Sequence, residues 1–403
     1  MAEHIIGLMC DPYHTNKSIC DVPPSIQTDK MSKRLSSVLD SLAVVLVSQE
    51  TKEVISVGVR LSPANEIVLS IADNKPVGLN IETHARDLWH RITKLSKGFR
   101  NYQKEHHMKF SENLQSEIAV LAIVHSLVKS GQFPTSTKDF DAFSNALELV
   151  TEQVRAILSD ESSVSYLEKD DYISLHYMKI VTSITQSIHV LIKVAYSPQV
   201  RAQFFSGKKL DIELVSSSTQ ILDFPQNKED YQQLADSVLF SLGDHLQGDE
   251  GAPPNHIMNN PSREVTVHSE CTLLLHLIKC SQDNESFHCL PFIGCSKLSC
   301  LSCFFFFESV RVEMGVNFQV GGSHGKIYPW VFPETALWKI DSNTAQEVQK
   351  RFTAMVKLRY VEVVRQKRAG RKSSLALSDS STDSASVEDS AAELLRDLGY
   401  EIP

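Results

Sequence analysis

Two short stretches of the sequence are the most informative about the fold: residues 268–279 read HSECTLLLHLIK, and residues 296–307 read SKLSCLSCFFFF. Each stretch carries metal-binding side chains in its first part and continues into an almost wholly apolar run. A run that is apolar on nearly every face predicts a helix covered on both sides. The sequence therefore places His268, Cys300 and Cys303 at the starts of two buried helices.

These three side chains have the composition of a catalytic zinc site. Zinc in hydrolytic enzymes is held by about three protein ligands, and its fourth position stays open for water. Two thiolates and an imidazole suit zinc by their softness, and the positive end of a helix stabilises thiolates. The predicted cofactor is Zn²⁺, bound by His268, Cys300 and Cys303.

Glu270 follows His268 by two residues and is the predicted catalytic residue. On the first turn of a helix, both side chains can reach one pocket without both binding the ion. A free carboxylate beside a metal-bound water can take a proton from it and later give that proton to the leaving group. If Cys271 or Cys295 became a fourth ligand, the site would instead be structural.

The residues before this region predict a helix followed by a β-hairpin. Apolar residues recur every three or four positions between Met31 and Leu46, which indicates a helix that buries one face. They then alternate with polar or small residues over 55–61 and 67–71, and the alternation stops at a turn-forming segment that contains Asn74.

Helices and strands are expected to alternate around the metal-binding residues, with a strand at 287–293 between the two apolar helices and another at 316–320 after the second. Such alternation is typical of an α/β layer. The intervening residues, from about 81 to 248, have the pattern of helices almost throughout, as in a bundle of five or six helices.

The order HxE, then CxxC, within these elements resembles the zinc-dependent nucleobase deaminase superfamily. In that family a proline precedes CxxC, whereas this chain has Ser299. The chain is most similar to a divergent toxin-like branch, abundant in fungi, in which a serine-lysine segment leads into the cysteines. In this branch a Gly-Ser-His segment with a later Trp and Pro follows, and here those residues are Gly322, Ser323, His324, Trp330 and Pro333.

The resemblance implies an α/β fold, with a cytidine-deaminase-like mixed sheet, helices on both faces and a large all-α insertion. It implies hydrolytic deamination, in which a zinc-bound water attacks the amine-bearing ring carbon of a nucleobase. The substrate would be a free nucleotide or nucleoside, or a single-stranded nucleic acid. Asn74, after the second strand, and His324 are the implied substrate-binding candidates.

These patterns divide the chain into seven expected parts. They are a loose leader (1–30), the first part of the deaminase-like core (31–76), a helical insertion (77–250), the second part of the core with the zinc motif (262–345), a long helix (346–372), a disordered tail rich in Ser and Asp (373–390) and a short terminal helix (391–403).

Composition narrows the class of protein. The net charge of −9 argues against binding nucleic acid over the whole surface. The N-terminus lacks the features of a secretion signal, so reduced thiols and a metal are favoured over disulfides. No apolar run reaches the roughly 18–20 residues of a membrane span, and we expect a soluble protein of the cytoplasm or nucleus.

Two alternatives stay open at this point. The chain could be a non-catalytic interaction protein, with a structural zinc site and a helical block that binds a protein partner. The long helix also ends in basic residues, for which a solvated face is the default interpretation and contact with nucleic acid the second. They are Lys357, Arg359, Arg365, Lys367, Arg368, Arg371 and Lys372. We expect His276 and His288 to be core residues, not ligands.

Overall fold

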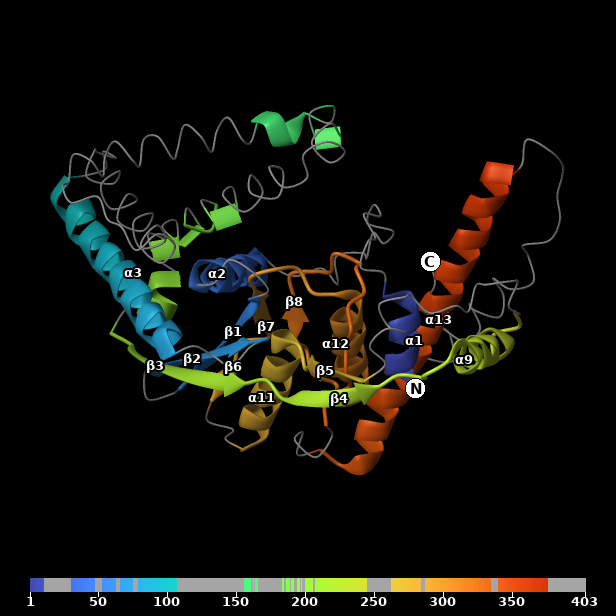
Figure 1. Cartoon of the computed structure of the whole chain (residues 1–403). Helices are drawn as coiled ribbons and strands as arrows, with labels where there is room; N and C mark the ends of the chain where they lie inside the picture. Colours follow the sequence, from blue (N-terminus) through green and yellow to red (C-terminus); the bar gives the residue numbers. More distant parts are fainter. Residues whose placement is uncertain are drawn as a thin grey trace.

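The computed structural model is shown in Figure 1. It describes residues 1–10, 30–47, 53–62, 66–74, 79–106, 207–244, 262–283, 287–334 and 340–375, together with short pieces between 156 and 205. The helices expected at 107–155 and 391–403, the loop before residue 262 and most of the serine-rich tail lie outside these residues.

The predicted hairpin lies at the centre of the fold. Strand β1 (Ile55–Leu61) pairs antiparallel with β2 (Glu66–Asp73), in a register that sets Ile55 opposite Asp73 and Leu61 opposite Ile67. Because successive side chains point to opposite faces, Val57 and its odd-numbered neighbours enter one core. Ser56 and Gly58 face the other side of the sheet.

A mixed sheet grows from this hairpin. Its order is β3-β2-β1-β7-β8, with a short strand β6 (His288–Cys289) also paired to β1. Strand β7 (Phe292–Cys295) is antiparallel to β1 and parallel to β8 (Gln319–Val320). The strand expected at 287–293 is split into β6 and β7, and Pro291, which has no N–H to donate to a ladder, lies between them.

Two strands lie where the sequence analysis expects helices, and this part of the prediction is wrong. Strand β3 (Lys209–Ser216) extends the sheet parallel to β2, and β4 (Thr219–Asp223) pairs antiparallel with β5 (Ser262–Thr266). Within β3, apolar residues alternate with Asp211 and Glu213, which is the period of two of a strand. The sequence analysis missed this strand because the surrounding residues have helical patterns. The pairing with β2 decides the conformation because β-propensity depends on the neighbouring strand.

Helices cover both faces of the sheet (Figure 1). Helix α2 (Lys30–Leu46) packs on β1 and β7, and α3 (Leu79–His106) lies beside β3. Helix α11 (Ser269–Asp283) packs on the opposite face, where it meets β1 and β2. A Cβ on Gly58 would come within 2.7 Å of Leu277 in α11, and one on Gly294 within 2.1 Å of the Leu39 backbone in α2. Glycine thus permits close approach on both faces.

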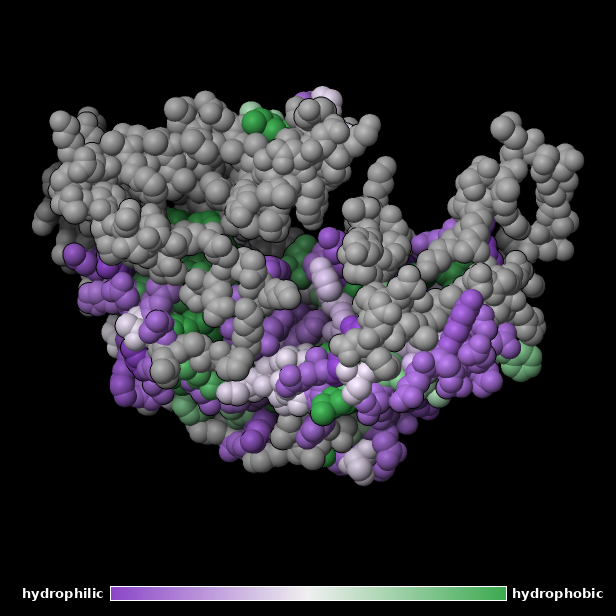
Figure 2. Space-filling model, viewed as in Figure 1, coloured by the Kyte–Doolittle hydropathy of each residue, from purple (hydrophilic) through white to green (hydrophobic). Residues whose placement is uncertain are grey.

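Three further helices enlarge the core on the α11 side. They are α12 (Leu301–Met314), α13 (Ser342–Leu375) and α9 (Lys228–Phe240). The visible surface of α9 is mainly hydrophilic (Figure 2). A short helix α1 (Ala2–Met9) packs against α13, with Ile5 and Ile6 buried. The first ten residues are therefore ordered, unlike the loose leader expected from sequence. A π-helical turn, η1 (Arg201–Phe205), completes the described elements.

Among the helices that the structure describes, none has the length and apolar content needed to cross a bilayer.

Candidate metal centre

His268 is held at the start of α11. Its carbonyl accepts from the backbone N–H of Thr272 at 3.0 Å, so His268 provides the first helical acceptor. The next residue, Ser269, donates its backbone N–H to Oδ1 of Asn74 at 2.6 Å, and its hydroxyl lies 2.9 Å from that of Ser56 in β1. These bonds satisfy part of the helix N-terminus and fix the imidazole relative to the hairpin.

The two cysteines begin α12. Cys300 is the N-cap residue, with extended backbone, and its sulfur accepts from the N–H of Cys303 at 3.4 Å. An N-cap side chain that accepts from N3 is the usual cap geometry. The CxxC spacing therefore brings both sulfurs together at the positive end of a helix, 3.4 Å apart.

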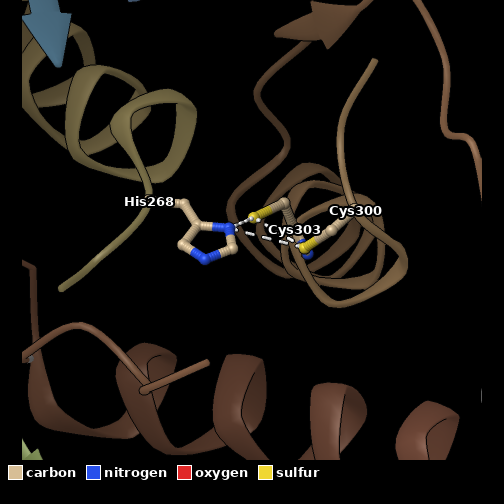
Figure 3. Close-up of side chains that lie close together, drawn as sticks. All are labelled: His268, Cys300 and Cys303. Atoms are coloured by element: carbon tan, nitrogen blue, oxygen red, sulfur yellow. Dashed lines mark hydrogen bonds between the residues drawn. The ribbon is translucent and has the colours of Figure 1, made fainter. Parts of the chain in front are cut away.

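The predicted ligands meet, as Figure 3 shows. Nδ1 of His268 lies 3.1 Å from Sγ of Cys303 and 3.5 Å from Sγ of Cys300. The three atoms lie within 4.8 Å of one another, close enough to hold one metal ion. Two segments more than thirty residues apart thus supply one imidazole and two thiols, a donor set that fits zinc.

Groups behind the ligands fix their orientation. The indole N–H of Trp330 donates to Sγ of Cys303 at 3.3 Å, and the His268 ring bonds to the backbone of Pro329. Trp330 is 0 % exposed and packs against Phe306 and Phe352. Such outer partners set ligand orientation in metal sites. Sequence analysis names Trp330 only as part of a family pattern, because an N–H···S bond has no sequence signature.

The pKa values of all three converging donors are shifted from their ordinary values. Removal from water raises the pKa of the Cys300 and Cys303 thiols well above the ordinary value. Burial alone would lower the pKa of His268, but the charge and hydrogen bond of Cys300 outweigh this and raise it to about 9. A cation among these donors would offset their desolvation, because a coordinated thiol is deprotonated outright. The buried, mutually bonded set therefore fits a divalent metal.

Glu270 lies in the first turn of α11 and is 4 % exposed. Its Oε2 accepts from the Ser269 hydroxyl at 3.5 Å, and its charge acts on His268, Cys303 and His324. It is not a member of the metal-binding group. A buried carboxylate therefore stands beside the three donors without joining them.

Two buried cysteines that could have become a fourth ligand also stay outside that group. Cys271 lies beside Cys303, and Cys295 in β7 lies 3.7 Å from the Ser56 hydroxyl, but neither belongs to the set of converging donors. Burial is the main cause that raises the pKa of both thiols. With three ligands in the group, tetrahedral zinc would keep one position for water.

Ser299 explains the departure from the proline of the usual motif. Its N–H donates to the carbonyl of Gly322 at 3.1 Å, and its own carbonyl accepts from the N–H of His324 and the hydroxyl of Ser323. A proline has no N–H and could not form the first of these bonds. Ser299 thus joins the cysteine loop to the Gly-Ser-His segment.

His324, one of the two substrate-binding candidates, lies close enough to the centre for the charges of Glu270 and His268 to affect its pKa. Its Nδ1 accepts from the N–H of Lys326 at 3.0 Å, and its ring meets Tyr328 edge-on. Burial, followed by the charge of Lys326, lowers the pKa of His324, so the ring is neutral near pH 7.

Asn74, the other candidate, reaches the start of α11 from the end of β2. Its carbonyl oxygen already binds Ser269, which gives the side chain a structural task that the sequence did not indicate. Its amide N–H groups are the part left for a ligand.

The basic end of α13 is partly neutralised. Arg365 and Arg368 both pair with Asp244, and Arg359, which is buried, pairs with Glu362. Three of the basic residues considered for nucleic-acid contact therefore have acidic partners within the chain.

A family model described as OTT_1508_deam, a "-like deaminase", matches residues 267–334. The match supports a likeness of this segment to the cytidine deaminase-like superfamily. The deaminase-like segment contains all three converging donors, Glu270, Ser299 and His324, and ends just after Pro333. The mixed sheet with helices on both faces is the α/β architecture expected of such a deaminase. No curated protein and no solved structure matches the chain.

Proposed function

We propose that this protein is a zinc-dependent hydrolytic deaminase that acts on a nucleobase. The observation that carries the proposal is the convergence of His268, Cys300 and Cys303 at the starts of two helices, with buried Glu270 beside them and outside the metal-binding group. A structural zinc site uses four protein ligands and has no need of a free acid.

When bound by these three residues, zinc would supply a Lewis acid that activates water at neutral pH. The overall change is replacement of a ring amine by a carbonyl oxygen: one C–N bond breaks, one C–O bond forms, and ammonia leaves. Of the two protons of water, one must reach the departing amine and the other the adjacent ring nitrogen. Glu270 is the residue assigned to move them, since its carboxylate can accept a proton and return it to the leaving group.

The residues around the centre suit the recognition of a base. His324 is held by the Ser299 and Lys326 backbone and is neutral, so its ring can stack on a base or bond to it without adding charge. Asn74 retains its amide donors for the same task. Engagement of Arg359, Arg365 and Arg368 by acidic neighbours favours a small nucleobase-containing substrate over a long single strand, whose binding requires cationic contacts.

The test is ammonia release by the zinc-loaded full chain from cytosine and adenine, offered as free bases, nucleosides, nucleotides and single-stranded DNA and RNA. We expect the parent to release ammonia from at least one class. Glu270→Gln should lower the rate by about 10²–10⁴-fold with an unchanged zinc content. Glu264→Gln, on the exposed side of β5, is the matched control and should keep full activity.

Equal rates for the parent and Glu270→Gln would contradict the assignment of Glu270. A zinc-loaded parent that is inactive on the whole panel would favour the competing function, a structural zinc site in an interaction protein.

A further inference from the structure

A second group of metal-binding side chains lies farther along α11. Nε2 of His276 is 2.9 Å from Oε2 of Glu213 in β3 and 3.4 Å from Sγ of Cys280. The donor atoms of the three residues lie within 4.8 Å of one another. The deaminase chemistry described above uses none of them.

Secondary structure brings these three donors together. His276 and Cys280 are four residues apart, a spacing that sets two side chains on the same face of a helix. That face packs against the sheet, where β3 runs parallel to β2 and presents Glu213. Two adjacent elements thus supply imidazole, thiol and carboxylate to one point.

The carboxylate is held in place from behind. Arg60 in β1 pairs with Oε2 of Glu213, and the buried hydroxyl of Ser70 in β2 donates to the same atom at 3.3 Å. Hydrogen bonds of this kind orient metal-ligating carboxylates. With Cys280 as a thiolate, the charges of Cys280, Glu213 and Arg60 sum to −1, which still attracts a dication.

We propose that Glu213, His276 and Cys280 bind a divalent metal of borderline softness, zinc in the first place, at a site separate from the deaminase centre. Nitrogen, sulfur and oxygen donors are those that zinc accepts. The Glu213 side chain is 37 % exposed, so solvent reaches the group and a water can complete the coordination.

The two sites are independent in geometry and in role. Eight residues separate His268 from His276, about 12 Å along the helix axis at 1.5 Å per residue, so the ions share no ligand. An ion at the second site would fasten β3 to α11 and through it to the core. This proposal does not rest on deaminase activity.

Without a metal, the same contacts form a hydrogen-bonded ion pair. Burial would lower the pKa of His276, but its bonds to Cys280 and Glu213 outweigh this and raise it to about 9, and the bond from His276 lowers the pKa of Glu213. The experiment therefore has to separate a metal-binding site from a charged pair of histidine and glutamate.

Metal content of the purified full chain makes this distinction. After exposure to Zn²⁺ and removal of excess by gel filtration, we expect two zinc ions per chain for the parent and one for Cys280→Ser or His276→Ala. Cys289→Ser is the matched control, because this neighbouring partly buried thiol is outside the group, and it should retain two. Cys303→Ala should lose only the other ion.

Cobalt substitution gives a second measurement that does not depend on the number of zinc ions per chain. The second equivalent of Co²⁺ bound by the parent should produce the charge-transfer absorption of a single thiolate, which Cys280→Ser removes while far-UV circular dichroism stays unchanged. Glu213→Gln, which keeps the side-chain shape, should weaken binding of this equivalent. One zinc per chain in the parent, unchanged in Cys280→Ser and His276→Ala, would overturn the proposal and leave only the ion pair.

Discussion

The two faces of the central sheet bury different kinds of residue. Under α2 and α3 the described core is aliphatic and aromatic, with Leu39, Val57 and Leu69 at its centre. Under α11 and α12 the described core contains five cysteines, namely Cys10, Cys271, Cys295, Cys300 and Cys303. Both groups of converging donors also lie on this side. One hairpin separates the two, since its odd-numbered residues face the first core and Ser56 faces the second.

The difference indicates that the apolar core on one face of β1 and β2 stabilises the fold, whereas the residues proposed for metal binding and catalysis lie on the other face. A close-packed apolar layer holds the hairpin rigid, and a rigid hairpin can position Asn74 and Ser56 against the start of α11. Functional groups held by such a scaffold keep their geometry. Substitutions on the two faces should therefore have separable effects, and four comparisons test this.

The largest contrast is expected between Cys303→Ala and Leu69→Ala. Loss of this thiol should abolish the proposed zinc binding at the first site and with it the proposed deaminase activity. Leu69→Ala removes a side chain that is 1 % exposed on the other face, and should cost about 2–5 kcal/mol of unfolding free energy while zinc content stays at the parent level. Urea denaturation and metal analysis measure the two effects, and loss of zinc from folded Leu69→Ala would break the proposed separation.

Asp40 gives the apolar face a pH dependence of its own. Burial raises the pKa of this α2 carboxyl to about 7, although the Cys295 N–H donates to it. The folded pKa is above the unfolded value, so the contribution to stability is complete below about pH 4 and is lost as pH rises towards 7. Each pH unit in this window costs at most about 1.4 kcal/mol.

Asp40→Asn keeps the acceptor oxygen and removes the ionisation. Relative to the parent, this variant should gain stability steadily between pH 4.5 and 7 and no further above that range, as measured by urea denaturation at each pH. A stability difference that does not change with pH would show that Asp40 ionises normally.

On the α11 face, Trp330→Phe should preserve the aromatic packing and delete the N–H···S bond to Cys303. Loss of an outer partner typically lowers metal affinity by about 10–100-fold, and a competition titration with a zinc chelator measures it. Phe332→Leu, in the same aromatic cluster but without a bond to the ligands, is the control for packing. Equal affinities in Trp330→Phe and the parent would remove Trp330 from the set of orienting groups.

The smallest effect is expected from Asn74→Ala. It leaves the N–H of Ser269 without its partner, at a cost of about 1 kcal/mol, as for the loss of a helix cap. If Asn74 only positions α11, kcat should fall and KM should stay unchanged, whereas a direct contact with substrate should also raise KM. Steady-state kinetics on the substrate found in the panel distinguish the two roles.

Several elements could be predicted because their signals are local. The alternation in β1 and β2, the three-and-four spacing of α2 and the apolar runs of α11 and α12 each report burial of one element, and the structure has all of them. The CxxC spacing fixes the sulfur pair by helix geometry alone.

Other features depend on partners that are distant in the chain. Strand β3 exists because β2 offers it a hydrogen-bonding edge, and α1 is ordered because α13 covers its apolar face. The bond from Ser269 to Asn74 spans 195 residues. In the sequence, His276 lies among apolar residues, as a core histidine does. Its charged partner, Glu213 of β3, is distant in the chain and is brought close only by the fold.

The sequence by itself determined the chemistry of the first centre: one imidazole, two thiols at a helix start, and an acid two residues after the histidine. Tertiary structure alone decided that Cys271 and Cys295 stay outside the donor group, that Ser299 joins two loops through an N–H that proline lacks, and that α11 carries a second group of donors. The physical reason is that ligand type and helical spacing are written in neighbouring residues, whereas which side chains converge depends on how the sheet and helices pack.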